Sequence, residues 1–594
     1  MAATRAVVKV QLLLADGSSR VGKGHSTGLQ NINIYTDIFN SAAIFRIILR
    51  WNTITGLTNA ATKYSDHIAL ITKGPDGKPI NYTYREYEEN VRTTAKAFLK
   101  LGLQKFHGVC ILGFNSPEWF FSCLGAICAG GISTGIYTTN SSKEQTDEEL
   151  DNVLKTIAIN QCCTAVFTSG TTGNPKGVML SHDNIIYDAS CIVAQLKFNR
   201  KSEVVISYLP LSHVAAQIVD MYLIMLIGGT IYFADKNALK GSLLNTLLEA
   251  RPTRFLGVPR VWEKIYEKMI QVGDQNGIIK KFIASWAKSQ GLQFHLNRIN
   301  GALIFTKIKQ ALGFDRCLTY ASAAAPISPD LKSYFMSIDI PISESYGMSE
   351  LSGAHTMGEP ETFDVNSVGK VIPGVKTKIV NSDAEQNGEV CMYGRHVFMG
   401  YLNEPVKTSE VVDEQGWMHS GDIGKIDYKS RIYITGRLKE LLITAGGENV
   451  APVPIEQQVQ LKMKYISNVI LIGDKRKFLS MLLTLKTEVN PDTGVPTDTL
   501  TKEVQAWLSS LDSQATTVSA VLAEGPHPKV LNAIEEDLKS VNQLAISNAQ
   551  KIQKFAILPK DFSIQDGELG PTMKLKRHII VNKYSVIIDG LYGK

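Results

Sequence analysis

Apolar and polar residues follow one another along this chain in blocks that are typical of strands followed by helices. Apolar positions recur every three or four residues from Tyr84 to Leu99, which predicts an amphipathic helix. The short apolar run 108–113 predicts a buried strand, and a further helix is predicted from Asn115 to Ala129. Strands that alternate with helices in this way indicate an α/β fold with a largely parallel sheet.

The same alternation continues through the middle of the chain. We predict a helix beginning at Val178, later strands at 204–209, 230–233, 255–258 and 317–320, and later helices near 259–272, 302–312 and 328–337. Shorter strands and turns then predict a β-rich part at about 386–438. We therefore expect three parts: an N-terminal extension at 1–60, a large α/β domain at 61–438 that ends in this β-rich part, and a small C-terminal α+β domain at 439–594.

Two segments affect this picture. Residues 141–167 leave room for only one acidic helix (147–157) and one short strand (164–167) before the next motif. The longest apolar window, 218–234, contains Asp220 and a pair of glycines. It therefore predicts a core helix followed by a buried strand rather than a membrane span.

Composition narrows the class of protein. The net charge is +6 over 594 residues, and the Lys and Arg residues are dispersed, which argues against a dedicated nucleic-acid surface. The eight cysteines show no CxxC pattern and no Cys/His metal spacing, so they are interpreted as buried, reduced thiols of a cytoplasmic protein. No secretory signal is evident, and any membrane contact is expected to be peripheral, on the endoplasmic reticulum or another membrane.

A glycine-rich stretch with the composition of a phosphate-binding loop follows the 164–167 strand. Its glycines allow close approach of the backbone to a ligand, and its hydroxyls and N–H groups are donors for anionic oxygens. The Walker A pattern does not fit, because the lysine lies between proline and glycine. The alternative is an ordinary surface turn. The residues that would bind phosphate are Thr168, Ser169, Gly170, Thr171, Thr172, Gly173, Asn174, Pro175 and Lys176.

Four further positions carry candidate chemistry, and each has an ordinary structural alternative. His213 follows a buried strand and would otherwise be a core histidine. A later turn combines an aromatic ring with two carboxylates suited to a hard cation, and would otherwise be a polar turn. Its residues are Glu344, Ser345, Tyr346, Gly347, Met348, Ser349 and Glu350. Asp422 can accept hydrogen bonds from ribose, and Arg437 suits phosphate or ribose oxygens; otherwise they are a turn residue and part of a solvated basic face.

In this order, and with a late lysine segment at 571–577, these motifs resemble the adenylate-forming superfamily of acyl-CoA synthetases, adenylation domains and luciferases. The resemblance covers about 80–590 and is nearest to the bubblegum type of long-chain fatty acyl-CoA synthetases. It implies that the chain is a long-chain fatty acid–CoA ligase that uses ATP, Mg²⁺ and coenzyme A. Such enzymes form an acyl-adenylate first and transfer the acyl group to coenzyme A afterwards.

The resemblance also implies roles for the motif residues. The glycine-rich loop would hold the β- and γ-phosphates, and the 344–350 turn would line the ATP site, with Tyr346 beside the adenine and Glu350 on Mg²⁺. Asp422 would bind the ribose, and Arg437 would bind ribose and phosphate. Lys574 would bridge the attacking carboxylate and the α-phosphate, and His213 would lie on the acyl and pantetheine side. The set expected to take part in catalysis is Lys574, Glu350 and His213.

Two further implications concern movement. Lys439 matches the hinge about which the small domain would rotate, after which a loop at Gly446, Gly447 and Glu448 would line the coenzyme A tunnel. Trp262 resembles the tryptophan that gates the acyl tunnel in long-chain members; the alternative is an indole packed in the core.

One departure from the family pattern is large. These enzymes normally carry additional βα units where this chain has only 141–167, and loss of an interior strand would expose apolar sheet edges. An alternative interpretation is therefore a shortened isoform or impaired paralogue that binds nucleotide or lipid without turnover. A second alternative is a luciferase-like or amino-acid-activating relative, which the tunnel segment and the lack of a carrier-domain serine motif argue against.

Overall fold

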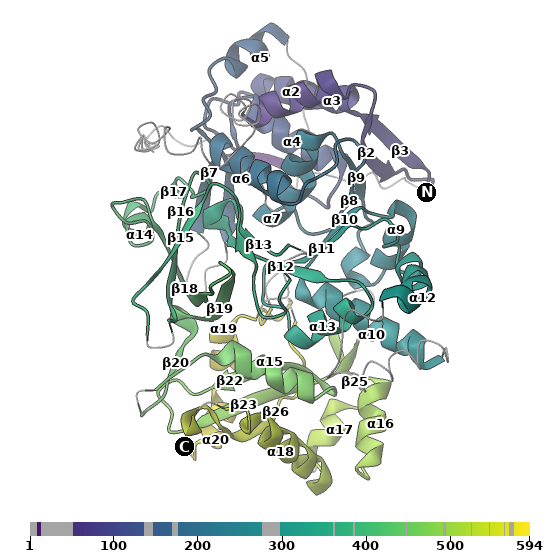
Figure 1. The fold of residues 1–594 in the computed structure, drawn as a ribbon, viewed down its shortest axis with the longest axis vertical. Helices are drawn as coiled ribbons and strands as arrows, with labels where there is room; N and C mark the ends of the chain where they lie inside the picture. The colour runs from purple at the N-terminus through teal and green to yellow at the C-terminus, as the bar shows by residue number, and fades with distance from the viewer. Residues whose placement is uncertain are drawn as a thin grey trace.

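The computed structural model shows an elongated molecule with several sheets and a smaller C-terminal region at one end (Figure 1). The residues that the structure describes are 9–13, 52–135, 147–168, 176–275, 298–359, 363–383, 386–446, 448–490, 493, 495–523, 525–545, 547–563, 565–569 and 575–593.

The first sheet is continuous although the segment 141–167 is short, because the strands β5 and β6 are direct neighbours. Its parallel strands β4, β5 and β6 are continued by antiparallel neighbours, and Ser133 of β5 pairs directly with Thr164 of β6. At the outer edge, β1 pairs antiparallel with β4 and covers its hydrogen-bonding edge. The order is β1 (Lys9–Leu13), β4 (Gly108–Leu112), β5 (Ile132–Gly135), β6 (Cys162–Thr168), β7 (Lys176–Ser181) and β17 (Gly400–Tyr401).

The helices of this region form as the sequence predicts. Helix α3 (Tyr84–Lys100) begins at a capping box between Thr83 and Glu86, and α4 (Pro117–Cys128) begins at Ser116. The acidic helix of the short segment is α5 (Asp147–Leu154). Helix α2 (Thr53–Lys63) packs on the same core, so part of the predicted N-terminal extension contributes to it.

The helix predicted from Val178 is wrong at its start. Residues Lys176–Ser181 form strand β7, which pairs along its length with β6, and helix α6 (His182–Gln195) begins only after it. The boundary is fixed by a capping box, in which Ser181 Oγ accepts from Asn184 N at 3.1 Å and Asn184 Oδ1 accepts from Ser181 N at 2.8 Å. The short apolar run 178–180 cannot by itself distinguish a strand from the first turn of a helix.

Two mixed sheets follow. One has the order β3 (Pro79–Thr83), β2 (Ile68–Lys73), β9 (Thr230–Phe233) and β8 (Val204–Ser207). The other has the order β10 (Arg254–Gly257), β11 (Thr319–Ser322), β12 (Ile342–Met348), β13 (Gly353–Met357) and β14 (Lys370–Val371). The predicted helices are α10 (Pro259–Gln275), α12 (Arg298–Ala311) and α13 (Pro329–Ser337). The α/β class is confirmed, although antiparallel pairs in every sheet make the sheets mixed rather than largely parallel.

The β-rich part is a four-stranded antiparallel sheet that begins slightly earlier than predicted. Its order is β15 (Lys376–Val380), β16 (Gly388–Tyr393), β18 (Met418–Ile426) and β19 (Ile432–Arg437). A tight turn at 427–431 joins β18 to β19, whereas β17 and helix α14 (Pro405–Ser409) lie between β16 and β18. Short apolar runs separated by turn residues mark this part in the sequence.

The C-terminal region has its own cores. Its central sheet is β22 (Ile466–Ile472), β23 (Leu479–Leu485) and β26 (Ile552–Ile557), and the buried residues of its two cores come from 442–588. The other helices and short strands of the region are β20 (Leu442–Ile443), β21 (Asn449–Val450), α15 (Pro452–Lys462), β24 (Thr487–Val489), β25 (Pro496–Leu500), α16 (Lys502–Ser510), α17 (Val518–Ala523), α18 (Pro528–Asn542), α19 (Arg577–Lys583) and α20 (Ser585–Leu591). Lys486 pairs with Glu267 of α10 at 3.4 Å across the contact with the large region.

The window 218–234 is divided as predicted. It forms a π-helical turn, η2 (Gln217–Leu223), then α8 (Ile224–Ile227), a left-handed Gly228 and the buried strand β9. Within the described ranges, none of the helices has both the length and the apolar character needed to cross a bilayer. All eight cysteines are buried free thiols, as predicted.

Candidate active site

The candidate site lies in a cavity of about 3010 Å³ between the ends of the large-region sheets and the C-terminal region. Strands of four sheets of the large region, namely β6, β8, β12 and β18, contribute to its wall together with neighbouring loops. Of the predicted site residues, those that line it are Thr168, Lys176, His213, Glu344, Ser345, Tyr346, Gly347, Met348, Ser349, Glu350, Asp422 and Arg437. Residues as far apart in the sequence as Thr168 and Arg437, 269 positions, are thus brought to one cavity.

Asp422 is the centre of a compact polar cluster. It lies opposite Arg437 in the β18–β19 register, and Arg437 Nε contacts its Oδ1 at 2.8 Å. The hydroxyl of Tyr346, from β12, donates to Asp422 Oδ2 at 2.6 Å. Burial and the nearby carboxylate hold the pKa of Tyr346 well above its usual value, so the phenol stays protonated. The ring, the carboxylate and the guanidinium therefore form one pre-arranged wall of the cavity.

Tyr401 joins the end of the glycine-rich loop to the predicted magnesium ligand. Its strand, β17, pairs with β7, and Lys176 Nζ lies 4.4 Å from the centre of the Tyr401 ring. The Tyr401 hydroxyl donates to Glu350 Oε1 at 2.8 Å. Tyr401 is not among the residues predicted from the sequence, because only the long-range pairing of β17 with β7 brings it here. A single tyrosine near a glycine gives no signal of its own.

The turn that contains Glu350 also includes a structural ion pair. Glu344 is almost fully buried and contacts Lys332 Nζ at 2.8 Å, and both side chains are shielded from solvent. Burial raises the pKa of Glu344, and Lys332 partly offsets this. Gly347 lies where a Cβ would come within 1.9 Å of the Gly353 carbonyl oxygen, so only glycine fits the bulge between β12 and β13. Glu344 and Gly347 thus shape the turn that presents Tyr346 and Glu350.

His213 lies on the apolar side of the same cavity. It caps the short helix α7 (Val214–Ala216), and its Nε2 is buried and has no hydrogen-bond partner among the residues that the structure describes. Burial lowers the pKa of His213, which keeps the imidazole neutral near pH 7. A neutral imidazole can lie against apolar groups in the cavity, and its unpaired Nε2 can form a hydrogen bond to a polar group of a ligand.

Trp262 lies in the core of the large region rather than on the cavity wall. It is fully buried, packs edge-to-face on Phe255 and Phe335, and donates from Nε1 to the Ala321 carbonyl oxygen at 3.2 Å. The indole lies directly against Gly257, where a Cβ would come within 2.7 Å of Nε1. This placement agrees with the structural alternative, and a gating role for Trp262 stays a prediction.

Several predicted site residues are not placed at the cavity. Ser169 to Pro175, Gly447 and Lys574 lie outside the described residues, as does the side chain of Lys439. Gly446 and Glu448 lie on the exposed turn between β20 and β21, where Glu448 accepts a hydrogen bond from Ser547 Oγ at 3.0 Å. Their predicted role depends on a second orientation of the C-terminal region.

Asp220 contributes a buried carboxyl group to the same cavity. Burial raises the pKa of Asp220 to about 8, and its Oδ2 has no partner in the part of the chain that the structure describes. In the unfolded chain the Asp220 carboxyl ionises above its usual pKa of about 3.9, whereas in the folded chain burial opposes its ionisation. Asp220 therefore costs no stability at low pH, and stability is lost as the pH rises toward about 8.

We expect Asp220→Asn to raise the midpoint of thermal unfolding more at pH 8 than at pH 5, because asparagine does not titrate. Each pH unit in this window changes the balance by at most about 1.4 kcal/mol. The measurement is thermal unfolding of both chains at pH 5, 6, 7 and 8. A midpoint difference that is constant with pH would show that Asp220 does not titrate in this way.

Comparisons with known proteins agree with the motifs. A family model described as AMP-binding enzyme matches residues 57–159 and 139–402, and one described as AMP-binding enzyme C-terminal domain matches 439–527. The chain belongs to the AMP-binding enzyme family. The two stretches overlap at 139–159, so the match continues on both sides of the short segment.

Individual relatives are similar over most of their length. The chain is 47% identical to the long-chain-fatty-acid–CoA ligase ACSBG2 of Xenopus laevis over an alignment 608 positions long, which covers 89% of this chain and 82% of the relative. It is 45% identical to the human long-chain-fatty-acid–CoA ligase ACSBG1, covering 90% and 84%. The resemblance to the bubblegum type is thereby confirmed.

Solved structures share the fold at low sequence identity. The A domain of carboxylic acid reductase from Segniliparus rugosus, solved with AMP and a co-purified carboxylic acid, superposes with a TM-score of 0.66 at 19% identity and covers 93% of this chain and 96% of that chain. The o-succinylbenzoate CoA synthetase of Bacillus subtilis gives 0.63 at 17% identity, with coverage of 88% and 97%. These similarities establish the fold.

Proposed function

We propose that this chain is an ATP-dependent long-chain fatty acid–CoA ligase that forms acyl-CoA through an acyl-adenylate. The observation that carries the proposal is the meeting of two polar clusters at one cavity, Tyr346–Asp422–Arg437 and Lys176–Tyr401–Glu350. The first provides a ring, an acceptor and a cation for a nucleoside, and the second provides a cation and a carboxylate for its phosphates. The names of the relatives support the same activity.

In the proposed reaction a carboxylate oxygen of the fatty acid forms a bond to the α-phosphorus of ATP. The bond from that phosphorus to the bridging oxygen breaks, and pyrophosphate leaves. The sulfur of coenzyme A then attacks the acyl carbon, and AMP leaves with the former carboxylate oxygen while the thiol proton is lost. Positioning and compensation of charge would lower the first barrier, through Lys176, Arg437 and Lys574.

Mg²⁺ is proposed as the accompanying ion, with Glu350 as its protein ligand. The Glu350 carboxylate is a hard oxygen donor on the cavity wall, held by Tyr401 on one oxygen, and this fits the preference of Mg²⁺ for one or two carboxylates beside substrate phosphates. When bound, Mg²⁺ would neutralise charge on the phosphates. Tyr401 would keep the carboxylate aimed at that position.

The chain is further proposed to act in the cytoplasm, with peripheral contact to a membrane from which it takes its fatty acid. The eight buried, reduced thiols support a reducing compartment. The acyl chain would lie along the apolar wall near His213, where a neutral imidazole is compatible with an uncharged neighbour.

The proposal is tested by incubating the purified full chain with ATP, Mg²⁺, coenzyme A and palmitate. We expect equal amounts of AMP and palmitoyl-CoA, measured by chromatography. Glu350→Gln should greatly reduce both products, whereas Glu404→Gln, a surface carboxylate close to β17, is the matched control and should leave them unchanged. A folded sample that yields no AMP with any chain length would instead favour the impaired paralogue that binds without turnover.

A further inference from the structure

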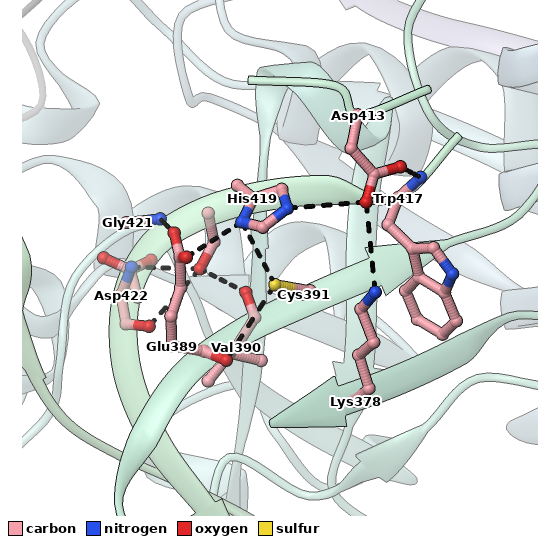
Figure 2. Close-up of polar contacts among 10 residues, drawn as sticks. Lys378, Glu389, Val390, Cys391, Asp413, Trp417, His419, Gly421 and Asp422 are labelled. Atoms are coloured by element: carbon pink, nitrogen blue, oxygen red, sulfur yellow. Dashed lines mark hydrogen bonds and ion pairs between the residues drawn. The ribbon is translucent and has the colours of Figure 1, made fainter. Parts of the chain in front are cut away.

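A cluster of metal-binding side chain types lies on the β-rich sheet, outside the clusters described above (Figure 2). Cys391 of β16 lies directly opposite His419 of β18 in the strand register, and Glu389 lies two residues before Cys391 on the same face. His419 Nδ1 is 3.5 Å from Cys391 Sγ and 2.9 Å from Glu389 Oε2. All three candidate ligand atoms lie within 4.8 Å of one another.

The other ring nitrogen of His419 faces a second carboxylate. Its Nε2 lies 3.6 Å from Asp413 Oδ2, on the side of the ring away from Cys391 (Figure 2). Asp413 is itself fixed, because its Oδ1 accepts from the backbone N–H groups of Gln415 and Trp417 at 2.9 Å each. A carboxylate behind a histidine is the usual arrangement at zinc sites, where it holds the distal proton and orients the ring.

We propose that Glu389, Cys391 and His419 form a binding site for a zinc-class transition-metal ion. A thiolate, an imidazole nitrogen and a carboxylate oxygen are the common protein ligands of Zn²⁺, and a fourth position would be left for water. The thiolate selects against Mg²⁺ and Ca²⁺, which prefer oxygen ligands alone. One thiolate and one carboxylate would neutralise the two charges of the ion.

Two of the three distances between the ligand atoms can be compared with zinc geometry. Zinc bonds of about 2.3 Å to sulfur and about 2.0–2.1 Å to nitrogen and oxygen, at tetrahedral angles, separate S and N by about 3.6 Å and N and O by about 3.4 Å. The observed S···N distance of 3.5 Å already matches, and Glu389 would withdraw by a few tenths of an ångström. Because the ligands stand on paired strands, little backbone order has to be created on binding.

Binding would change protonation at two side chains. Burial, together with Glu389, raises the pKa of the Cys391 thiol to about 12, so the ion must displace the thiol proton, which is released to solvent. With the metal on Nδ1, the remaining ring proton of His419 would lie on Nε2, which faces Asp413. Lys378, 3.9 Å from Asp413, is the nearby cation of this group and would not meet the metal directly.

The site is linked to the nucleotide wall through Glu389. Its second oxygen, Oε1, accepts from Gly421 N at 3.0 Å, directly before Asp422. This bond does not compete with the metal, because the metal would use Oε2. An ion at the site would therefore stiffen the turn that carries Asp422, without taking the place of the Mg²⁺ proposed at Glu350.

The test uses the full chain loaded with Co²⁺, whose thiolate complexes absorb in the near ultraviolet, and with Zn²⁺, measured by elemental analysis after gel filtration. We expect one ion per chain, a cobalt–thiolate band, and loss of both in Cys391→Ser. Cys110→Ser is the matched control: it removes another buried thiol, which belongs to no such ligand group among the described residues, and should keep the band.

Two further variants test the geometry if Cys391→Ser is unstable. His419→Gln should also lose the band, and Asp413→Asn should weaken Zn²⁺ binding about 10–100-fold while leaving the band of the saturated protein in place. Folding of each variant is checked by circular dichroism. Absence of the band in folded wild-type protein, or its persistence in folded Cys391→Ser, would overturn the site, and neither result would bear on acyl-CoA formation.

Discussion

Lys574→Ala should suppress acyl-adenylate formation by about 10²–10³-fold while changing thioester formation from supplied acyl-adenylate much less. A positioned cation that meets charge as it develops at the α-phosphate typically contributes an effect of this size. In the proposed mechanism the lysine would be needed only in the first half-reaction, because the second would take place after the C-terminal region has rotated. The measurements are fatty-acid-dependent pyrophosphate release and, separately, acyl-CoA formation from synthetic palmitoyl-adenylate.

Lys560→Ala is the control for this experiment. Lys560 is a surface lysine of the same region that pairs with Asp566, so its loss removes the same charge away from the site. Equal loss of both half-reactions in Lys574→Ala would contradict the assigned role and would indicate damage to the fold or to nucleotide binding in general.

Asp422→Ala should lower kcat/KM for ATP by about 100-fold or more. The carboxylate is almost buried and contacts both Arg437 and Tyr346, so its removal would lose the proposed ribose acceptor and would also release two other groups of the wall. Hydrogen bonds to a charged group contribute about 1.5–3 kcal/mol each, and 1.4 kcal/mol corresponds to a factor of ten. Steady-state kinetics with ATP as the varied substrate measures the loss.

The chain offers a closely matched control on the same hairpin. Asp427 also accepts from a tyrosine and an arginine, Tyr433 and Arg431, at 3.1 and 2.8 Å, but it does not line the cavity. Asp427→Ala should therefore leave kcat/KM nearly unchanged. Asp422→Ala should also lose most of the preference for ATP over 3′-deoxy-ATP, and an unchanged preference would show that Asp422 does not bind the ribose.

The sequence predicts the local structure well where periodicity and caps agree. Helix α3 illustrates this, because its apolar spacing is regular and Thr83 with Glu86 marks its first turn. Strand β7 is not predicted by the sequence, because its conformation depends on pairing with β6 and with β17, which lies more than 200 residues further on. The local sequence does not indicate which distant strands will pair with it.

In the candidate site, too, some features can be predicted from local sequence and others depend on long-range contacts. The residues Tyr346, Asp422 and Arg437 are found from motifs, whereas the hydrogen bonds that join them follow only from the way β12 meets the β18–β19 hairpin. The cluster of Cys391 and His419 could not be found from spacing, because the two residues are 28 positions apart and become neighbours through strand register. The buried position of Trp262 depends on the packing of a whole core and is equally invisible in the sequence.

The short segment is the feature that most challenged the enzyme interpretation. In the structure no sheet edge is left open by the short segment among the described strands. Ser133 of β5 pairs directly with Thr164 of β6, and β1 covers the edge of β4. These contacts keep the sheet that carries β6 and β7 continuous up to Thr168 and from Lys176 onward. The described ends of the glycine-rich loop are therefore held by paired strands on both sides.

The central claim, adenylation of a fatty acid by this chain, is tested most directly with palmitate labelled with ¹⁸O in its carboxylate. With ATP, Mg²⁺ and coenzyme A, the proposed reaction transfers one labelled oxygen to AMP, because AMP leaves with the oxygen that attacked the α-phosphorus. Mass spectrometry should find AMP with one ¹⁸O and pyrophosphate with none. AMP without label, or no AMP from folded protein, would contradict the account.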